Sequence, residues 1–187
     1  MDLKEHPLYK KHQKYLEWTR QSVPLKEFSA LDKLKKIDYE FEKEPNFKIL
    51  ENPTQIVIHH AEIDGGNRDY YHWLHKALFG WDAVGYHFII GNGLEGLSID
   101  GEVEIGRELN VQGAHVRDHN HYTIGICLTG NFDNYLPSEK QMISLKKLVK
   151  ELRVKFNITT KIKYHRDFDG VTKSCPGKQF PDLYDLL

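Results

Sequence analysis

The stretch from Lys163 to Gly177 constrains the fold more than any other part of the chain. It reads KYHRDFDGVTKSCPG, so His165 ends a short strand-like run, Cys175 follows ten positions later, and Lys173 stands two positions before that cysteine. Imidazole nitrogen and thiolate sulfur are ligands that zinc prefers. The stretch therefore predicts two metal ligands beside a cation, and the fold must bring a third ligand from elsewhere.

The best source of a third ligand is the run Gln55 to His60, in which β-branched residues end abruptly in two histidines. A buried strand delivers its terminal side chains to the edge of a sheet, so both segments can present histidines at the same end. Two imidazoles and one thiolate leave the fourth position of a zinc ion open for water, as in catalytic rather than structural sites. His59 and His60 point to opposite faces of a strand, so the pattern alone leaves open which of them is the ligand.

Composition limits the class of protein. The chain has 187 residues, 40% of them hydrophobic, which is enough for one domain with a sizeable core plus an appendage. Two cysteines, Cys127 and Cys175, are too few for a disulfide framework, and a net charge of −1 does not attract nucleic acid or an anionic membrane. The first seven residues are charged and lack the apolar core of a signal peptide, and no apolar run approaches the length of a membrane span. We therefore expect synthesis in a reducing cytoplasm.

Residues 1–50 differ from the rest of the chain in their sequence pattern. Apolar residues recur at helical spacing from Leu8 to Thr19 and again after Pro24, with lysines and glutamates on the other faces. This predicts an N-terminal helical extension over 1–50, either packed on the main domain or used as a targeting or partner-binding arm. The boundary is expected near Glu51-Asn52-Pro53, with the main domain over 51–187.

From Ile56 onward, strand and helix patterns alternate. One helix is expected between a cap at Asn67 and Gly80, and Ser138 with Gln141 forms a capping box that opens a second, long helix. The remaining patterns predict strands at 55–60, 86–90, 122–128 and 162–164, with an Asp-Gly hairpin turn at 100–101. The fold class expected from this order is α/β, a mixed central β-sheet flanked by helices.

Five short motifs occur in one order along the chain: Ile58-His59-His60-Ala61, Val84-Gly85-Tyr86-His87-Phe88, Gly113-Ala114-His115, Asn120 with Thr123-Ile124-Gly125-Ile126, and His165-Arg166-Asp167 with Lys173-Ser174-Cys175-Pro176-Gly177. Together they resemble the type 2 N-acetylmuramoyl-L-alanine amidases, a family shared by peptidoglycan recognition proteins and bacteriophage endolysins. The resemblance covers about two thirds of the chain.

The resemblance implies a zinc hydrolase that cleaves the amide between N-acetylmuramic acid and the L-alanine of the peptidoglycan stem peptide. It implies one Zn²⁺ held by His59, His165 and Cys175, and catalytic roles for Tyr86 and Lys173. Zinc would lower the pKa of its bound water to about 7 and polarise the scissile carbonyl. Lys173 and the hydroxyl of Tyr86 are suited to stabilise the tetrahedral oxyanion, and Tyr86 could also relay a proton to the departing amine.

Other residues are expected around the substrate or in supporting roles. His115, Asn120, Trp81 and His60 are predicted on the substrate-binding side, His60 also as a residue that packs against or orients a metal ligand. Some branches of the family carry a carboxylate where this chain has Cys127, which we expect to be a core residue without a catalytic role. Four further histidines are expected to be exposed or polar loop residues: His72 and His75 beside Trp73, and His119 and His121.

Two other classes of function are consistent with the residues alone. The chain could be a non-catalytic peptidoglycan receptor on the same fold, or Cys175 could be a nucleophile activated by His165, as in cysteine peptidases that cut stem peptides. Without a signal peptide, an endolysin released through a membrane lesion and acting on the cell wall competes with a cytoplasmic amidase that recycles muropeptides. No oligomeric state is predicted.

Overall fold

The computed structural model describes residues 47–183. The two helices expected within the first 46 residues, and the last four residues of the expected C-terminal segment, lie outside this range. The boundary placed near residues 51–53 therefore stays a prediction.

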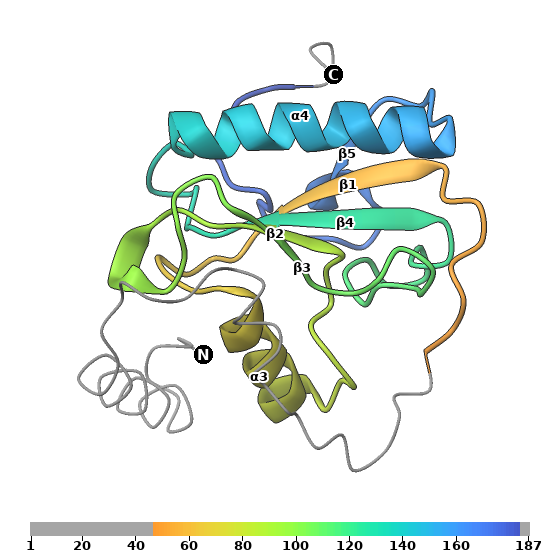
Figure 1. Cartoon of the computed structure of the whole chain (residues 1–187), viewed down its shortest axis with the longest axis horizontal. Helices are drawn as coiled ribbons and strands as arrows, with labels where there is room; N and C mark the ends of the chain where they lie inside the picture. The colour runs from red at the N-terminus through yellow and green to blue at the C-terminus, as the bar shows by residue number, and fades with distance from the viewer. Residues whose placement is uncertain (1–46, 184–187) are drawn as a thin grey trace, which may run out of the picture. The chain divides into compact units, whose positions relative to one another are not determined.

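A five-stranded mixed sheet forms the centre of the described region, in the strand order β3-β2-β4-β1-β5 (Figure 1). The strands are β1 (Gln55–His60), β2 (Phe88–Ile90), β3 (Val103–Ile105), β4 (Thr123–Leu128) and β5 (Lys163–Tyr164). Strands β2, β4, β1 and β5 run parallel, and only the edge strand β3 is antiparallel to its neighbour. The carboxyl ends of four strands therefore meet at one edge of the sheet, the place where open α/β sheets bind ligands.

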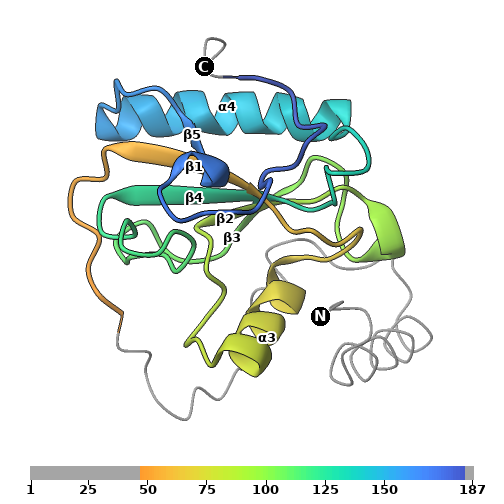
Figure 2. The same ribbon diagram turned by 180° about the vertical axis from the view of Figure 1, so that it is seen from behind.

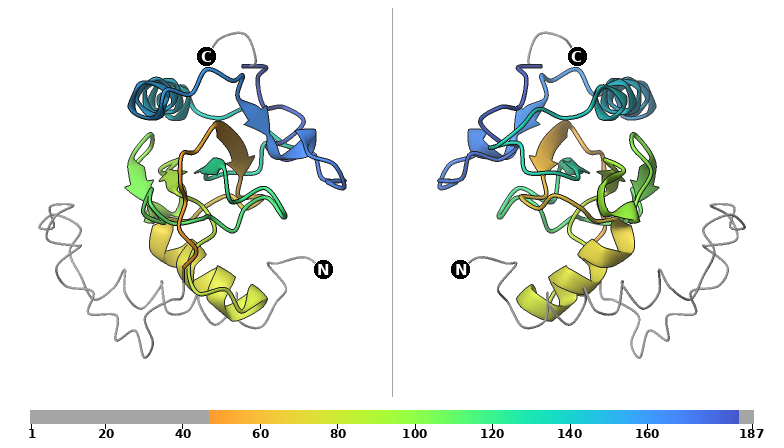
Figure 3. Two further views of the ribbon diagram at one scale, coloured as in Figure 1. Left: turned by 90° about the vertical axis from the view of Figure 1, so that its right-hand side faces the viewer. Right: turned by 90° about the vertical axis from the view of Figure 1, so that its left-hand side faces the viewer.

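Helices lie on both sides of the sheet, as Figures 1 and 2 show: α4 (Glu139–Phe156) runs along one face, and α3 (Arg68–Phe79) lies on the other side. Figure 3 shows the same layers seen end-on. The expected α/β fold with a mixed central sheet is confirmed. Among the described residues, no helix is long and apolar enough to cross a bilayer.

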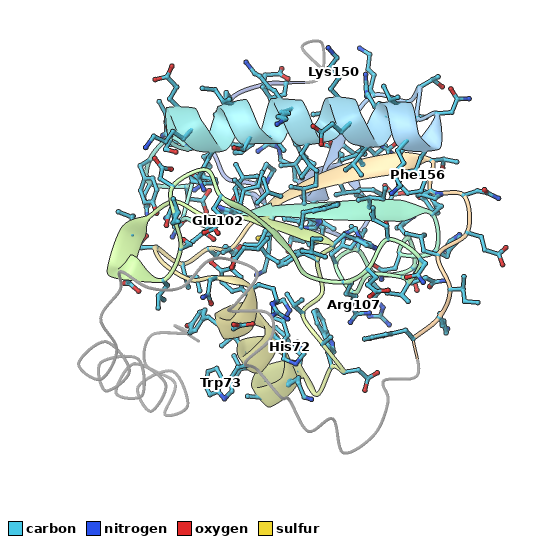
Figure 4. The ribbon with its side chains drawn as sticks, viewed as in Figure 1. His72, Trp73, Glu102, Arg107, Lys150 and Phe156 are labelled. Atoms are coloured by element: carbon cyan, nitrogen blue, oxygen red, sulfur yellow. The ribbon has the colours of Figure 1, made fainter. Side chains whose placement is uncertain are left out.

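Helix α3 begins and ends where the capping residues predict, and α4 begins where its capping box predicts. In α3, Asn67 accepts a hydrogen bond from the amide of Tyr70, and Gly80 adopts the left-handed conformation that ends the helix. In α4, Ser138 and Gln141 form the expected capping box. The side chain of Lys150 points away from the sheet while Phe156 points toward it, so α4 turns one apolar stripe to the core (Figure 4).

The main core fills the space between α4 and the sheet. It joins Ile56 and Ile58 of β1 and Ile124 and Ile126 of β4 to the inner side chains of the helix, which include Leu145, Leu148, Val149 and Leu152. Because side chains alternate along a strand, Val57 and His59 lie on the opposite face of β1. This alternation separates a dry apolar face from the face that carries the candidate site.

Two strand predictions differ from the structure in detail. The strand expected over 86–90 is shorter in the structure, because β2 begins at Phe88 and Tyr86 and His87 precede it. The backbone amide of His87 still donates a hydrogen bond to the carbonyl of Gly125 in the neighbouring strand β4. The Asp-Gly turn exists, with Gly101 at φ +80°, but it lies within a connection of twelve residues between β2 and β3 rather than directly joining two strands.

Candidate metal centre and active site

Three side chains converge at the carboxyl edge of the sheet. One ligand atom from each of His59, His165 and Cys175 lies within 4.8 Å of the others, and Nδ1 of His59 is 3.8 Å from Sγ of Cys175. His59 and Cys175 are buried while His165 is partly exposed. Two imidazoles and a thiol facing one point, with access on one side, are a donor set that fits a catalytic zinc ion.

Strand register explains this convergence. In the parallel pairing of β1 with β5, Ile58 is opposite Tyr164, so the next residues, His59 and His165, are also neighbours. Their rings lie 4.7 Å apart between centroids. Cys175 is held against the same edge because Sγ accepts a hydrogen bond of 3.5 Å from the amide of His60. The ligands thus come from the sheet edge and the loop that follows it.

A chain of hydrogen bonds fixes the tautomer of His59. The hydroxyl of Thr123 donates to the carbonyl of His119 at 2.8 Å, so its oxygen is available to accept from Nε2–H of His115 at 3.4 Å. Nδ1 of His115 is then an acceptor, and Nε2–H of His59 donates to it at 3.0 Å. This assignment leaves the lone pair of Nδ1 of His59 directed at Cys175, where a metal ion needs it.

Two glycines make room for His115. A side chain at Gly125 would begin 2.6 Å from its ring, and one at Gly113 would begin 2.4 Å from it. Asn120 holds the backbone of the same segment, because its Oδ1 accepts from the amides of His115 and Val116 at 2.9 and 3.1 Å. The contacts of His115 and Asn120 are therefore with the protein itself, and contact with substrate stays a prediction for both.

Burial determines the protonation of the ligands. Burial lowers the pKa of His59 well below its usual value, and the nearby His115 and His165 lower it further. Burial also lowers the pKa of His165, with Lys173 as the next cause, so both imidazoles are neutral at pH 7. Burial raises the pKa of the Cys175 thiol to about 12, so this sulfur becomes a thiolate only when a metal cation replaces its proton. The three groups are thus suited to a metal ion.

Tyr86 lies beside the candidate ligand His59, and its catalytic role stays a prediction. Its ring is 5.2 Å from that of His59 and 5.5 Å from that of His75, and its hydroxyl interacts with the thiol of Cys127. Burial raises the pKa of Tyr86 well above 10, followed by the effects of Cys127 and Cys175, so the phenol stays protonated and can donate. Trp81 contacts His75, which in turn contacts Tyr86; the ring centroids of Trp81 and His75 are 5.0 Å apart.

Lys173 lies at the exposed side of the centre. Its side chain is 62% exposed, and Nζ donates to Oε2 of Glu62 at 2.9 Å. The other oxygen of Glu62 is 3.7 Å from Nε2 of His60, whose Nδ1 accepts from the amide of Phe132. His60 and then Lys173 lower the pKa of Glu62 to about 2, so it is an anion at neutral pH. His60 thus lies beside Glu62 and Phe132, and its supporting role stays a prediction.

The prediction that His72 and His75 are exposed is wrong. Both are buried, with 8% and 6% of their surface exposed. Nδ1 of His75 accepts a hydrogen bond of 2.9 Å from the amide of Gly85, and burial lowers the pKa of this histidine to about 4. The spacing of these histidines on the helix did not reveal that this part of α3 faces the loop before β2. The sequence expectation for the partly exposed His119 is consistent with its hydrogen bond to Tyr122.

Two residues, Glu62 and Thr123, had no role in the site predicted from the sequence. Glu62 lies three positions after His59, beyond the strand, and no pattern links it to Lys173, which is 111 positions away. Thr123 occurs in the fourth of the five sequence motifs, but at the start of β4 its residue type indicates only an ordinary β-branched strand residue. An acidic residue directly after a ligand-bearing strand is the one signal that could have drawn attention to Glu62.

Comparisons with known proteins concern the sequence and the overall fold. Residues 50–178 match a family described as N-acetylmuramoyl-L-alanine amidase. The endolysins of Klebsiella phage KP32 and Escherichia phage T7 are 35% and 34% identical to this chain over 141 residues, which is 70% of this chain and 84% of each endolysin. The solved structure of the N-acetylmuramoyl-L-alanine amidase LysC from Clostridium intestinale URNW superposes with a TM-score of 0.61 at 34% identity, covering 73% of this chain and 88% of LysC.

Proposed function

Because this chain belongs to the N-acetylmuramoyl-L-alanine amidase family, we propose that it hydrolyses the bond between N-acetylmuramic acid and L-alanine in peptidoglycan with a zinc ion held by His59, His165 and Cys175. The observation that carries the proposal is the convergence of these three ligand atoms within 4.8 Å, at the edge where parallel strands end. When bound, zinc supplies a water of lowered pKa and polarises the amide carbonyl.

The chain's own residues stabilise the charge that develops on the amide oxygen. Tyr86 keeps its proton and presents an O–H donor beside His59, and the ammonium of Lys173 lies on the exposed side of the centre. Donors placed where an oxyanion forms are worth about 3 kcal/mol each in measured cases. The phenol of Tyr86 can also pass a proton toward the departing amine. His115 and Thr123 keep His59 in the tautomer that binds metal.

A cysteine peptidase mechanism is less consistent with the geometry. A nucleophilic cysteine needs a lowered pKa, whereas burial raises the pKa of Cys175 to about 12. Sγ of Cys175 also contacts both His59 and the amide of His60, rather than one histidine that could act as its base. A receptor without activity would have no need of Tyr86 and Lys173 at the same edge.

Inhibitor chemistry on purified cell walls tests the proposal. We expect a chelator to abolish the release of new L-alanine amino termini and zinc to restore it. Loss of activity to a thiol alkylator while chelation has no effect would favour the peptidase, and binding without any new amino termini would favour the receptor. The effect of alkylation must be interpreted together with the measured zinc content, since Cys175 is a proposed zinc ligand.

We also propose that the natural substrate is the polymeric cell wall, reached after release from the cell. The relatives named endolysins support this assignment. The competing assignment is recycling of soluble muropeptides. Intact sacculi and small anhydro-muropeptides should therefore be compared as substrates at equal bond concentration. Rapid cleavage of the small substrate alone would contradict the endolysin assignment.

A further inference from the structure

Glu62 joins two groups that border the metal centre from opposite ends of the sequence. Its Oε2 accepts from Nζ of Lys173 at 2.9 Å, and its Oε1 lies 3.7 Å from Nε2 of His60. Lys173 is two positions before Cys175, and Glu62 is three positions after His59. The carboxylate therefore connects the two ligand-bearing segments on the side where His165 is partly exposed.

The backbone of Glu62 is in an unfavourable conformation. Its φ is +59°, in the left-handed region, which glycine adopts freely and asparagine or aspartate tolerate better than glutamate. Non-glycine residues held in this region cost free energy and cluster at functional sites. The side chain held there is about one-third exposed and faces both His60 and Lys173.

The ion pair contributes little as a stabilising element. Lys173 is 62% exposed, and ion pairs with such exposure are weak, because solvent screens them and side-chain entropy opposes them. The benefit of the contact lies instead in where it holds the ammonium. The ammonium of a lysine is carried on a flexible four-carbon stem, so without a partner it samples many positions.

We propose that Glu62 is a positioning residue that holds the ammonium of Lys173 at the exposed side of the metal centre, ready for the oxyanion. This inference rests on the proposed function, in which Lys173 stabilises that charge. The carboxylate itself exchanges no proton with substrate and forms no bond to it. The free ammonium hydrogens of Lys173, which can donate three hydrogen bonds in all, remain available to the amide oxygen.

Two substitutions separate positioning from folding. Glu62→Gln removes the charge but keeps the size, and Glu62→Gly removes the contact while relieving the left-handed backbone. For both zinc-loaded variants we expect kcat to fall about tenfold with KM changed less than about twofold, because misplacing a group that acts in the transition state lowers turnover. Zinc content should be unchanged. The thermal midpoint of Glu62→Gly should equal or exceed that of the parent, since glycine adopts this φ without steric cost.

Asp118→Asn is the matched control. Asp118 is also an acidic residue with positive φ, at +64°, and its Oδ2 lies 3.9 Å from a neighbouring cation, Arg117. Its side chain is 87% exposed and belongs to no part of the site described above. Removing this charge should leave kcat and KM unchanged.

A double-mutant cycle with Lys173→Ala decides whether Glu62 acts through the lysine. If it does, Glu62→Gln should cause no further loss of kcat in the Lys173→Ala background. Parental kcat in Glu62→Gln, or the same tenfold loss with and without Lys173, would overturn the inference while leaving the proposed function intact. Parental kcat in Lys173→Ala would overturn the oxyanion assignment on which both depend.

Discussion

The two faces of strand β1 are both buried but chemically opposite. On β1, Ile56 and Ile58 pack beneath α4 in an apolar core, whereas Val57 and His59 lie on the face that carries His87, Cys127 and the ring of His115. The α4 face is held by non-directional burial, which tolerates small shifts. The opposite face, which we call the histidine face, is held by hydrogen bonds that require defined histidine tautomers. It also requires glycine at two positions, Gly113 and Gly125, to make room for the ring of His115. The main apolar core thus lies on one face and the candidate metal centre on the other.

The strongest test of this separation removes a ligand. Cys175→Ala and His165→Ala should each abolish zinc binding, and activity should fall more than about 10³-fold, because a catalytic metal supplies several kcal/mol of transition-state stabilisation. The fold should persist, since the apolar core beneath α4 is untouched. Metal analysis together with cell-wall hydrolysis measures both effects. A variant that keeps stoichiometric zinc would contradict the ligand assignment.

Lys173→Ala separates metal binding from catalysis within the histidine face. We expect full zinc content with a loss of kcat of about 10²–10³-fold, the range for removing one oxyanion donor. The exposure of this side chain predicts little change in the free energy of unfolding. Equal kcat in variant and parent would refute the role given to the lysine.

Leu145→Ala tests the other face. Leu145 is fully buried between α4 and the sheet, so its truncation should lower the free energy of unfolding by about 2–5 kcal/mol. Zinc affinity and kcat per folded molecule should match the parent at temperatures where both are folded. Urea unfolding followed by circular dichroism measures the first effect. A large fall in kcat of the folded variant would show that the two faces are coupled.

Acidification should distinguish the faces as well. Burial lowers the pKa of His75 and of His87 to about 4, from 6.5, so the unfolded chain binds protons that the folded chain does not. Stability of the metal-free protein should therefore fall as pH drops from 6.5 towards 4, by up to about 3 kcal/mol for each histidine. Leu145→Ala should shift the whole pH curve downward without changing its slope. A parental curve that is flat over this range would contradict the assigned burial of neutral imidazoles.

The smallest expected effect comes from removing the hydrogen bond between His59 and His115. His115→Ala removes the acceptor that orients His59, and loss of such partners typically weakens metal affinity about 10–100-fold. Competition with a chelator of known zinc affinity measures this change. Undiminished affinity would show that the tautomer of His59 does not depend on His115.

Local sequence signals predicted the elements of this fold but not their mutual packing. Asn67, Gly80 and Ser138 determine helix ends through contacts within a few residues, so those ends are confirmed. The candidate metal ligands His59, His165 and Cys175 were predicted because their residue types and motifs are distinctive, and the structure brings them together. The roles of Glu62 and Thr123 were not predicted, since these roles depend on partners brought together only by strand register and loop closure. The burial of His75 was missed for the same reason.

The central claim is that His59, His165 and Cys175 together bind one zinc ion. A crystal structure of the zinc-loaded protein, with anomalous scattering recorded at the zinc edge, tests it most directly. We predict one peak, at about 2.0–2.1 Å from a nitrogen of each histidine and about 2.3 Å from Sγ of Cys175, with a fourth position open to water. A peak bound by other residues, or no peak between these three side chains, would contradict the account.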